Sequence, residues 1–225
     1  MSGKYYAVKS GRQPGIYESW KECQEQIYKY SGAVFKAFTK RPEAEAYLQA
    51  AEEKAINNNL PLAFIDGTAR LDASKRPVLY GWGGFILNGG EIHIVQGTGD
   101  NPEYLPERNI AGEVIGLLQV VFKCQRLGIR EINVFFDYAG LEQWAAGAWK
   151  VKSPMAKYYR DTLQLLEDDV KINFFHVKGH TGITGNEIAD ALAKQAAGVK
   201  LTKKAAALID DLKAGRLAEF EGRAN

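Results

Sequence analysis

Short apolar segments separated by turn residues, together with longer amphipathic stretches, dominate the chain from residue 61 onward. Three strand-like segments come first, and Asn88-Gly89-Gly90 between the second and third is typical of a hairpin turn. Helical and strand-like segments then alternate. Strands are expected at 61–66, 78–87, 91–96, 131–137 and 172–177, and helices at about 104–127, 140–149, 154–168 and 185–197. This order predicts an α/β fold, in which a mixed sheet of three antiparallel strands followed by parallel strands is flanked by helices.

The first 48 residues show a separate pattern of strand, turn, strand, helix, strand and helix, which predicts a small α+β domain at 1–48. Ser19 is followed three residues later by Glu22, a capping box that predicts a helix start. Residues 49–60 are expected to link this domain to a larger one at 61–198. Residues 199–225 follow as a C-terminal tail, in which 203–213 has the pattern of a short amphipathic helix.

Composition is typical of a soluble globular protein, with 225 residues of which 46% are hydrophobic and 25% charged. No apolar run approaches the length of a membrane span, and the first residues lack the apolar core of a signal peptide. A cytoplasmic location is therefore expected. Cys23 and Cys124 are too few and too far apart for a disulfide framework or a zinc site.

The net charge of +2 says little, but the charge is unevenly distributed. Residues 1–41 contain eight lysine or arginine residues and three glutamates, which leaves this segment at +5. A basic segment rich in aromatic residues is a reasonable platform for nucleic acid. A solvated, lysine-rich surface gives the same charge, so charge alone leaves both interpretations open.

Four acidic residues stand at points where strands and helices can aim them at one place. Asp66 and Asp137 each end an apolar, strand-like run. Glu113 lies near the start of the longest predicted helix, and Asp190 lies in the last one. Carboxylates gathered without matching cations repel one another, so a site that keeps them usually holds divalent metal. Ligands of this kind favour Mg²⁺ or Mn²⁺ over zinc.

The order of these elements and residues resembles type 1 ribonuclease H over about residues 61–198. The motifs that carry the resemblance are Phe64-Ile65-Asp66-Gly67-Thr68, Arg108-Asn109-Ile110-Ala111-Gly112-Glu113, Phe135-Phe136-Asp137, and His176-Val177-Lys178-Gly179-His180 through Asn186-Glu187-Ile188-Ala189-Asp190. The resemblance implies hydrolysis of the RNA strand of an RNA–DNA hybrid, leaving 5′-phosphate and 3′-hydroxyl ends. It also implies two Mg²⁺ ions, or Mn²⁺ in their place, held by the four acids, with Asp66 bridging both ions.

The same resemblance implies roles for residues around the acids. His180, in a glycine-flanked loop, would assist proton transfer and product release, with a structural loop histidine as the alternative. Asn109 would contact the hybrid and read the 2′-hydroxyl. Gly67 would let the backbone approach the RNA closely, with an ordinary turn glycine as the alternative. Glu187 would either support the metal ligands from outside or complete a capping box at the start of its helix. His176 lies within a strand and is expected to be a packing residue.

Residues 4–48 resemble the hybrid-binding domain found ahead of some ribonucleases H. The motifs that carry this resemblance are Tyr5-Tyr6-Ala7-Val8-Lys9, Gly15-Ile16-Tyr17, Ser19-Trp20 with Cys23, and Phe35-Lys36 with Phe38. By this resemblance Trp20 and Phe35 contact the sugar–phosphate backbone of the DNA strand. Lys36, together with Tyr17, would support phosphate or minor-groove contacts. The expected partner of the chain is therefore an RNA–DNA hybrid.

Two differences from relatives weaken the expected binding of the hybrid. Ala37 stands where some relatives have a second lysine, and no long basic helix follows Asp137. A resolvase or transposase of the same fold is one alternative function, although the Lys-Gly-His and Asn-Glu-x-x-Asp motifs favour ribonuclease H. A catalytically silent hybrid-binding protein is another, and the presence of all four acids argues against it.

Overall fold

The computed structural model describes residues 4–30, 33–52, 57, 59–177 and 184–216. The chain divides into two compact units, Met1–Ile56 and Asn57–Asn225. Among the helices of the described residues, none combines the length and the apolar character that crossing a bilayer requires. The larger unit carries the four acids.

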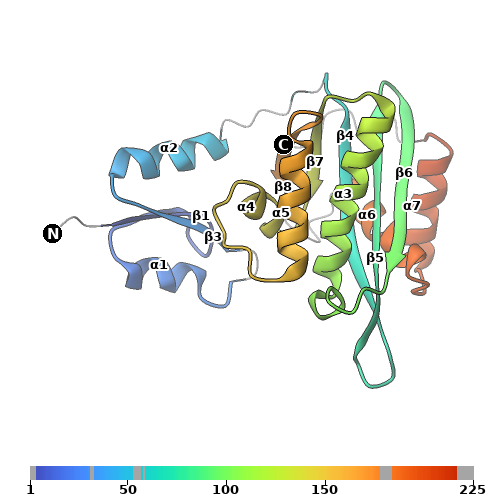
Figure 1. Ribbon diagram of the computed structural model, residues 1–225, viewed down its shortest axis with the longest axis horizontal. Coiled ribbons are helices and arrows are strands. Elements are labelled where there is room, and N and C mark those ends of the chain that lie inside the picture. Colours follow the sequence, from blue (N-terminus) through green and yellow to red (C-terminus); the bar gives the residue numbers. More distant parts are fainter. Residues whose placement is uncertain (1–3, 31–32, 53–56, 58, 178–183, 217–225) are drawn as a thin grey trace. The chain divides into compact units, whose positions relative to one another are not determined.

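A five-stranded mixed sheet forms the centre of the larger unit (Figure 1). Its strands are β4 (Leu62–Leu71), β5 (Pro77–Asn88), β6 (Glu91–Gly99), β7 (Glu131–Phe136) and β8 (Lys171–His176). Their order in space is β6-β5-β4-β7-β8. The first three strands are antiparallel neighbours, whereas β7 runs parallel to β4 and β8 runs parallel to β7. The predicted arrangement of three antiparallel strands followed by parallel strands is confirmed.

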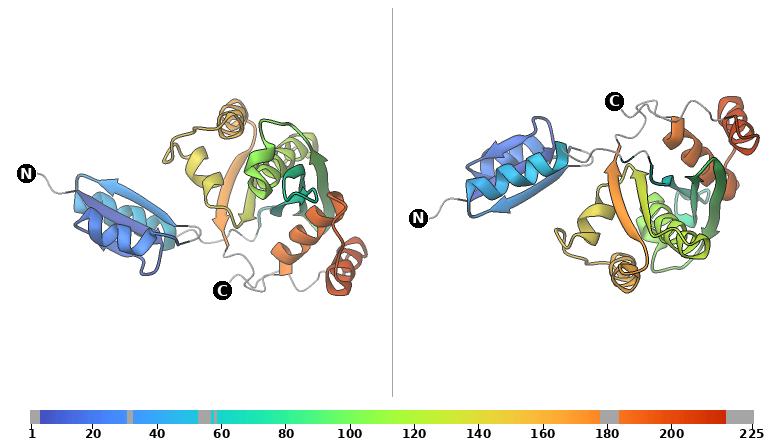
Figure 2. Two further views of the ribbon diagram at one scale, coloured as in Figure 1. Left: turned by 90° about the horizontal axis from the view of Figure 1, so that it is seen from below. Right: turned by 90° about the horizontal axis from the view of Figure 1, so that it is seen from above.

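Helices cover both faces of this sheet, as the two views of Figure 2 show. The helices are α3 (Asn109–Leu127), α4 (Gly140–Ala145), α5 (Pro154–Leu166), α6 (Thr184–Ala196) and α7 (Lys203–Lys213). The first three lie on one face, and α6 with α7 lies on the other (Figure 2). Residues 146–153, between α4 and α5, contain no helix, so the long basic helix of some relatives is absent here. The tail helix α7 has the predicted bounds and packs on α6.

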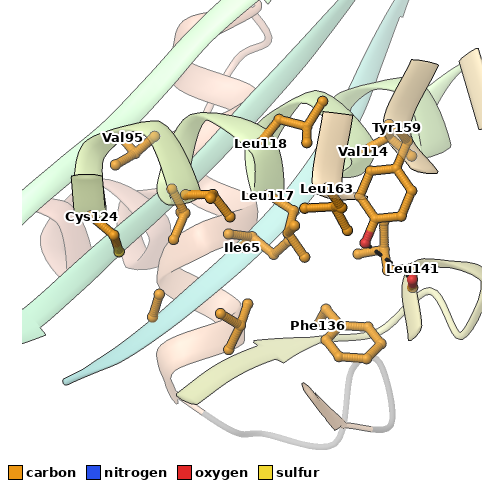
Figure 3. Close-up of a cluster of buried hydrophobic side chains, with 14 of the residues drawn as sticks. Ile65, Val95, Val114, Leu117, Leu118, Cys124, Phe136, Leu141, Tyr159 and Leu163 are labelled. Carbon is orange, nitrogen blue, oxygen red and sulfur yellow. Dashed lines mark hydrogen bonds between the residues drawn. The ribbon is translucent and has the colours of Figure 1, made fainter. Parts of the chain in front are cut away.

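The main core lies between α3, α5 and the sheet (Figure 3). Its largest fully buried side chains include Ile65, Leu117, Leu118, Phe136, Leu141 and Tyr159. The Tyr159 hydroxyl donates a hydrogen bond to the Leu141 carbonyl oxygen at 3.0 Å, so this buried polar group is satisfied. The hydrogen bond ties α5 to α4 beside the end of β7.

Glycines let two helices approach the sheet at backbone distance. A Cβ atom placed on Gly67 of β4 would overlap the Asn109 carbonyl oxygen and the Glu113 nitrogen of α3. A Cβ atom placed on Gly83 of β5 would overlap the Ala193 nitrogen of α6. Because these neighbours are backbone atoms, they cannot rotate away as a side chain would. The glycines therefore allow the helices that carry two of the acids to pack directly on β4 and β5.

Strand β4 is longer than the sequence pattern suggested. The strand was expected to end at Asp66, but it continues to Leu71 because its second half pairs with β5, down to the contact between Leu71 and Pro77. Asp66 therefore lies in the interior of a central strand. Helix α4 is shorter than expected and ends at Ala145, just before Gly147 adopts a left-handed φ of 65°.

The long helix α3 begins later than its apolar pattern suggested. Residues Leu105–Glu107 form a separate 3₁₀ turn, and Arg108 then adopts a φ of 54°. This conformation is unfavourable for a residue with a Cβ and interrupts the helical backbone. Asn109 is consequently the first residue of α3, which leaves its side chain exposed.

The smaller unit is a three-stranded antiparallel sheet with one helix on each side (Figure 1). Its elements are β1 (Tyr5–Ser10), β2 (Gly15–Tyr17), α1 (Trp20–Ile27), β3 (Val34–Phe38) and α2 (Arg41–Glu52). The strand order is β2-β1-β3. The Ser19 side chain accepts a hydrogen bond from the Glu22 nitrogen at 3.2 Å, which confirms the predicted helix start. Helix α2 continues beyond the expected boundary at residue 48.

Candidate active site

Three of the four acids converge beside the centre of the larger sheet. Asp66 lies in β4, Asp137 directly follows β7, and Glu113 lies in the second turn of α3. One carboxylate oxygen from each of the three lies within 4.8 Å of those from the other two. We call this group the acidic triad.

The strand register and the close approach of α3 explain this convergence. β4 pairs with β7 in parallel, with Phe64 opposite Phe135. The same register carried two residues further places Asp66 beside Asp137. Because α3 packs on β4 at backbone distance, Glu113 reaches the same point from the helix. A position in β4, a position directly after β7 and a position in α3, far apart in sequence, therefore share one site.

Burial makes the ionised forms of two members of the acidic triad unfavourable. The side chains of Asp66 and Glu113 are only 8% and 1% exposed. Burial raises the pKa of both carboxyls well above their ordinary values, and the charges of the neighbouring acids raise them further. Two backbone amides oppose this effect: the Gly67 N–H donates to Asp66 Oδ1 at 2.6 Å, and the Tyr138 N–H donates to Glu113 Oε2 at 3.2 Å. These two bonds also fix the orientation of the carboxylates.

The donor set of the triad fits a divalent cation. Its ligand atoms are hard carboxylate oxygens, which suit Mg²⁺, Mn²⁺ or Ca²⁺. In the part of the chain that the structure describes, no lysine or arginine forms an ion pair with Asp66, Glu113 or Asp137. Buried acids without a cationic partner are otherwise costly, so a bound cation would relieve their repulsion.

Two family models and several relatives match the chain. The model of the ribonuclease H1 N-terminal domain matches residues 4–48, and the RNase H model matches residues 131–198, which include Asp137 and Asp190. The curated ribonuclease H of Alcanivorax borkumensis is 30% identical over 142 residues, covering 60% of this chain and 89% of that protein. This chain belongs to the ribonuclease H family. The family expectation drawn from the sequence motifs is thereby confirmed, and with it the assignment of the chain as an enzyme.

Other matches extend the similarity across both units of this ribonuclease H. Rat ribonuclease H1 is 23% identical over 257 residues, which cover 87% of this chain and 90% of that protein. The solved structure of LC11-RNase H1, isolated from compost by a metagenomic approach, shares the fold, with a TM-score of 0.50 and 22% identity. That match covers 62% of this chain and 96% of the compost protein.

The fourth acid, Asp190, lies near the triad but is engaged elsewhere. It sits on α6, on the opposite side of the sheet from α3, and its charge contributes to the raised pKa of Asp66. Its Oδ2 accepts a hydrogen bond from Lys194 Nζ at 2.6 Å. The structure thus gathers three acids tightly and leaves the fourth beside them in an ion pair, a contact that the sequence analysis did not consider.

The other residues expected around the acids are placed as follows. Asn109 is exposed at the start of α3, one turn before Glu113. Glu187 pairs with Lys204 of α7, at 2.8 Å from its Oε2, which gives it a structural role in holding α7 against α6. His180 lies outside the described residues.

Gly67 and His176 have surroundings that differ from those expected. The space that a side chain at Gly67 would need is filled by the backbone of α3, so helix packing by itself requires a glycine at this position. His176 is exposed, which corrects the expectation of a packing residue. Its Nε2 lies 2.9 Å from the Asp137 carbonyl oxygen, a contact that ties the end of β8 to the acid-bearing end of β7. Sequence periodicity gave no signal for this contact.

The aromatic residues of the smaller unit form one surface cluster. Trp20 packs between Tyr6 and Phe35, with 5.6 Å between ring centroids in each pair, and Trp20 remains 45% exposed. The register places Tyr17 opposite Tyr6, on the same face of the sheet. We call Tyr6, Trp20 and Phe35 the aromatic cluster. Tyr6 was not singled out in the sequence, although its alternation with the buried Val8 places both on the α1 face.

Lys36 lies on the other face of the same sheet. It follows Phe35 on β3, and successive residues of a strand point to opposite faces. Its Nζ lies 5.6 Å from the centre of the Phe38 ring and 5.9 Å from that of Tyr47 on α2. The structure therefore separates Lys36 from Tyr17, Trp20 and Phe35, which share the α1 face.

The raised pKa values of Asp66 and Glu113 predict how the metal-free enzyme responds to pH. In the unfolded chain these groups lose their protons near their ordinary pKa values of 3.8 and 4.5. The folded protein holds the protons to higher pH, so above those values it binds more protons than the unfolded chain. Stability contributed by these groups is therefore lost as pH rises.

Thermal unfolding in the presence of EDTA, from about pH 5 to about pH 8, measures this effect. The melting temperature should fall as pH rises, and added Mg²⁺ should restore it because a cation that binds the ionised acids stabilises the native state. The glutamine variant Glu113→Gln should show a smaller fall. A flat or rising melting temperature in EDTA, shared by both proteins, would contradict the prediction.

Proposed function

We propose that this ribonuclease H hydrolyses the RNA strand of RNA–DNA hybrids with two divalent cations, leaving 5′-phosphate and 3′-hydroxyl ends. Asp66, Glu113, Asp137 and Asp190 would hold the cations, Mg²⁺ or Mn²⁺. The observation that supports this most strongly is the acidic triad, in which Asp66 and Glu113 are buried, no member forms an ion pair with a lysine or arginine among the described residues, and the hard oxygen ligands lie within 4.8 Å of one another. Family membership supports the choice of a nucleic acid as substrate.

At this site the acids would bind the cations, and backbone amides orient the acids. Divalent cations, when bound, activate the attacking water and neutralise the charge on the departing oxygen. Asp66 belongs to the acidic triad and its charge is also coupled to that of Asp190, so it is the acid best placed to serve both cations. The amides of Gly67 and Tyr138 hold two of the carboxylates in fixed orientations, which lowers the reorganisation that binding requires.

Other groups of the chain would select the RNA strand and bind the hybrid. Asn109 is exposed, one helical turn from Glu113, so its amide can reach the minor groove where the 2′-hydroxyl is displayed. His180 would assist proton transfer and product release, a role that suits an imidazole whose ordinary pKa lies near neutral pH. The aromatic cluster of the smaller unit would pack on sugars of the DNA strand, while its lysines neutralise phosphates.

The proposed activity is tested with hybrids labelled on either strand, incubated with Mg²⁺, with Mn²⁺ or with EDTA. Cleavage of the RNA strand alone, dependent on the cation, is the expected result. Ligation and phosphatase treatment of the products then identify the ends. Cutting of duplex DNA would indicate a transposase-like activity instead, and binding without cleavage would indicate a silent hybrid-binding protein. Either outcome would overturn the proposal.

Substitution of Trp20 by alanine is expected to weaken hybrid binding by about tenfold, because loss of one aromatic contact of this kind costs about 1–3 kcal/mol. The ring is 45% exposed and packed on both sides by the rest of the aromatic cluster, so it is presented to a ligand in a fixed position. Hybrid affinity is measured in EDTA to prevent cleavage. Single-turnover cleavage at saturating enzyme should be unchanged, because the acidic triad lies in the other unit.

Tyr28→Ala is the matched control for this variant. Tyr28 is 59% exposed and lies just after α1, but it makes no ring contact with the aromatic cluster among the described residues. Its removal should leave the affinity within about twofold of the unchanged protein. Equal losses in both variants would show that general surface aromaticity, and not the cluster, is responsible.

A further inference from the structure

Lys194 is the one cation that the structure places directly on the acidic site, among the described residues. It lies four residues after Asp190 on α6, so the two side chains share one face of the helix. Their Nζ and Oδ2 atoms are 2.6 Å apart, and both side chains are partly exposed, at 38% and 27%. The contact is a short, charge-assisted hydrogen bond.

The influence of Lys194 extends beyond its own partner. Its positive charge acts on Asp66 as well, where it partly offsets the repulsion from Asp137 and Asp190. Asp190 is absent from the group of ligands that lie within 4.8 Å of one another. The fourth acid is therefore the one held by an ammonium group, and the three acids without such a partner are the ones that converge.

We propose that Lys194 is an internal counter-ion that occupies the place of a divalent cation at Asp190 and must leave when that cation binds. This inference rests on the proposed metal site. Lys194 is thus a positioning residue: it acts through Asp190 and sets how much divalent cation the enzyme needs. The inference applies to the cation that Asp190 holds and leaves the ligands of the other cation, Glu113 and Asp137, unaffected.

Charge and geometry support an exchange of this kind. An ammonium hydrogen-bonded to Oδ2 and a divalent cation coordinated at about 2.1 Å by the same carboxylate would be like charges only a few ångströms apart. Their repulsion favours one occupant at a time. The lysine stem is flexible and 38% of the side chain is already exposed, so the ammonium can move into solvent at low cost. Without a divalent cation, Lys194 limits the repulsion between Asp190 and Asp66.

The test is a calorimetric titration of the full chain with Mn²⁺ alone, without nucleic acid. Lys194→Met should bind Mn²⁺ about tenfold more tightly than the unchanged protein, because no internal cation has to be displaced. Lys194→Gln should give the same shift and keeps a polar group at this partly exposed position, in case methionine impairs folding. Lys194→Arg preserves the charge and should restore an affinity close to that of the unchanged protein.

Lys171→Met is the matched control. Lys171 forms an ion pair with Glu131 at 2.9 Å, at the opposite ends of β7 and β8 from Asp137, so its removal should not change Mn²⁺ affinity.

In an Asp190→Asn background, Lys194→Met should have little further effect, since the pair is already broken. Melting temperatures in EDTA should fall for Lys194→Met, although it binds Mn²⁺ more tightly. A purely structural lysine would not produce these opposite changes.

The outcomes separate this inference from the proposed function. If the unchanged protein binds no Mn²⁺, the proposed metal site fails and this inference fails with it. If the unchanged protein binds Mn²⁺ and Lys194→Met binds it equally or more weakly, the counter-ion role alone is overturned, because the ammonium would then be neutral or helpful to cation binding.

Discussion

Replacing Asp66 with asparagine is expected to slow hybrid cleavage by about 10³-fold or more, equivalent to ~4 kcal/mol of transition-state stabilisation. The charge of Asp66 is coupled to those of both Asp137 and Asp190, and its oxygen lies within 4.8 Å of those of Glu113 and Asp137. A neutral amide keeps the shape of the side chain but cannot serve as an anionic ligand between two cations. Hybrid affinity should change little, because the substitution removes no positive charge that could contact phosphate.

Single-turnover cleavage at saturating Mg²⁺ and hybrid affinity in EDTA measure the two expectations separately. Asp168→Asn is the control, since Asp168 is an exposed acid between α5 and β8, and it should cleave at the rate of the unchanged protein. Asp66→Asn should also raise the melting temperature in EDTA, because one buried, repelled charge is removed. Cleavage within about tenfold of the unchanged protein would show that Asp66 is not a shared ligand.

Local sequence patterns predicted which strand or helix carries each acid, but they did not predict which of these elements lie side by side. The ends of apolar runs located Asp66 and Asp137 beside strands, and amphipathic spacing located Glu113 on a helix. The register that sets Asp66 beside Asp137 depends on contacts between distant segments, such as the stacking of Phe64 on Phe135 with 4.7 Å between ring centroids. Periodicity within one strand does not encode which strand lies next to it.

Two further features could have been read from spacing alone. Lys194 follows Asp190 by four residues on a predicted helix, a spacing at which opposite charges meet. Lys36 follows Phe35 on a predicted strand, so the two must point to opposite faces. The contact between His176 and the Asp137 carbonyl oxygen is different, because it joins two parallel strands whose pairing only the folded structure reveals.

Gly67 has a packing role that the sequence motif did not reveal. The resemblance to ribonuclease H implied that Gly67 lets the backbone approach the RNA closely, with an ordinary turn glycine as the alternative. The structure shows that the missing side chain makes room for α3, whose backbone at Asn109 and Glu113 fills that space. The glycine thus contributes to the site by seating the helix that carries one of its acids.

Gly67→Ala is therefore expected to lower the free energy of unfolding by about 3 kcal/mol or more, the upper range for overpacking of a well-packed core. The added Cβ would overlap backbone atoms of α3, so the helix as a whole must shift away from β4. That shift would move Glu113 away from Asp66 and reduce cleavage together with stability. Urea denaturation and single-turnover cleavage of the same preparation measure both effects.

Gly128→Ala is the control that separates crowding from backbone conformation. Gly128 ends α3 with a φ of 70°, and a Cβ atom there meets nothing within 4 Å, so alanine should cost only about 1 kcal/mol and leave cleavage intact. If Gly67 instead serves a close approach to RNA, Gly67→Ala would keep the stability of the unchanged protein and lose only hybrid affinity. Because the atoms that crowd this position all belong to α3, we expect loss of stability to be the primary effect and loss of activity to follow from it.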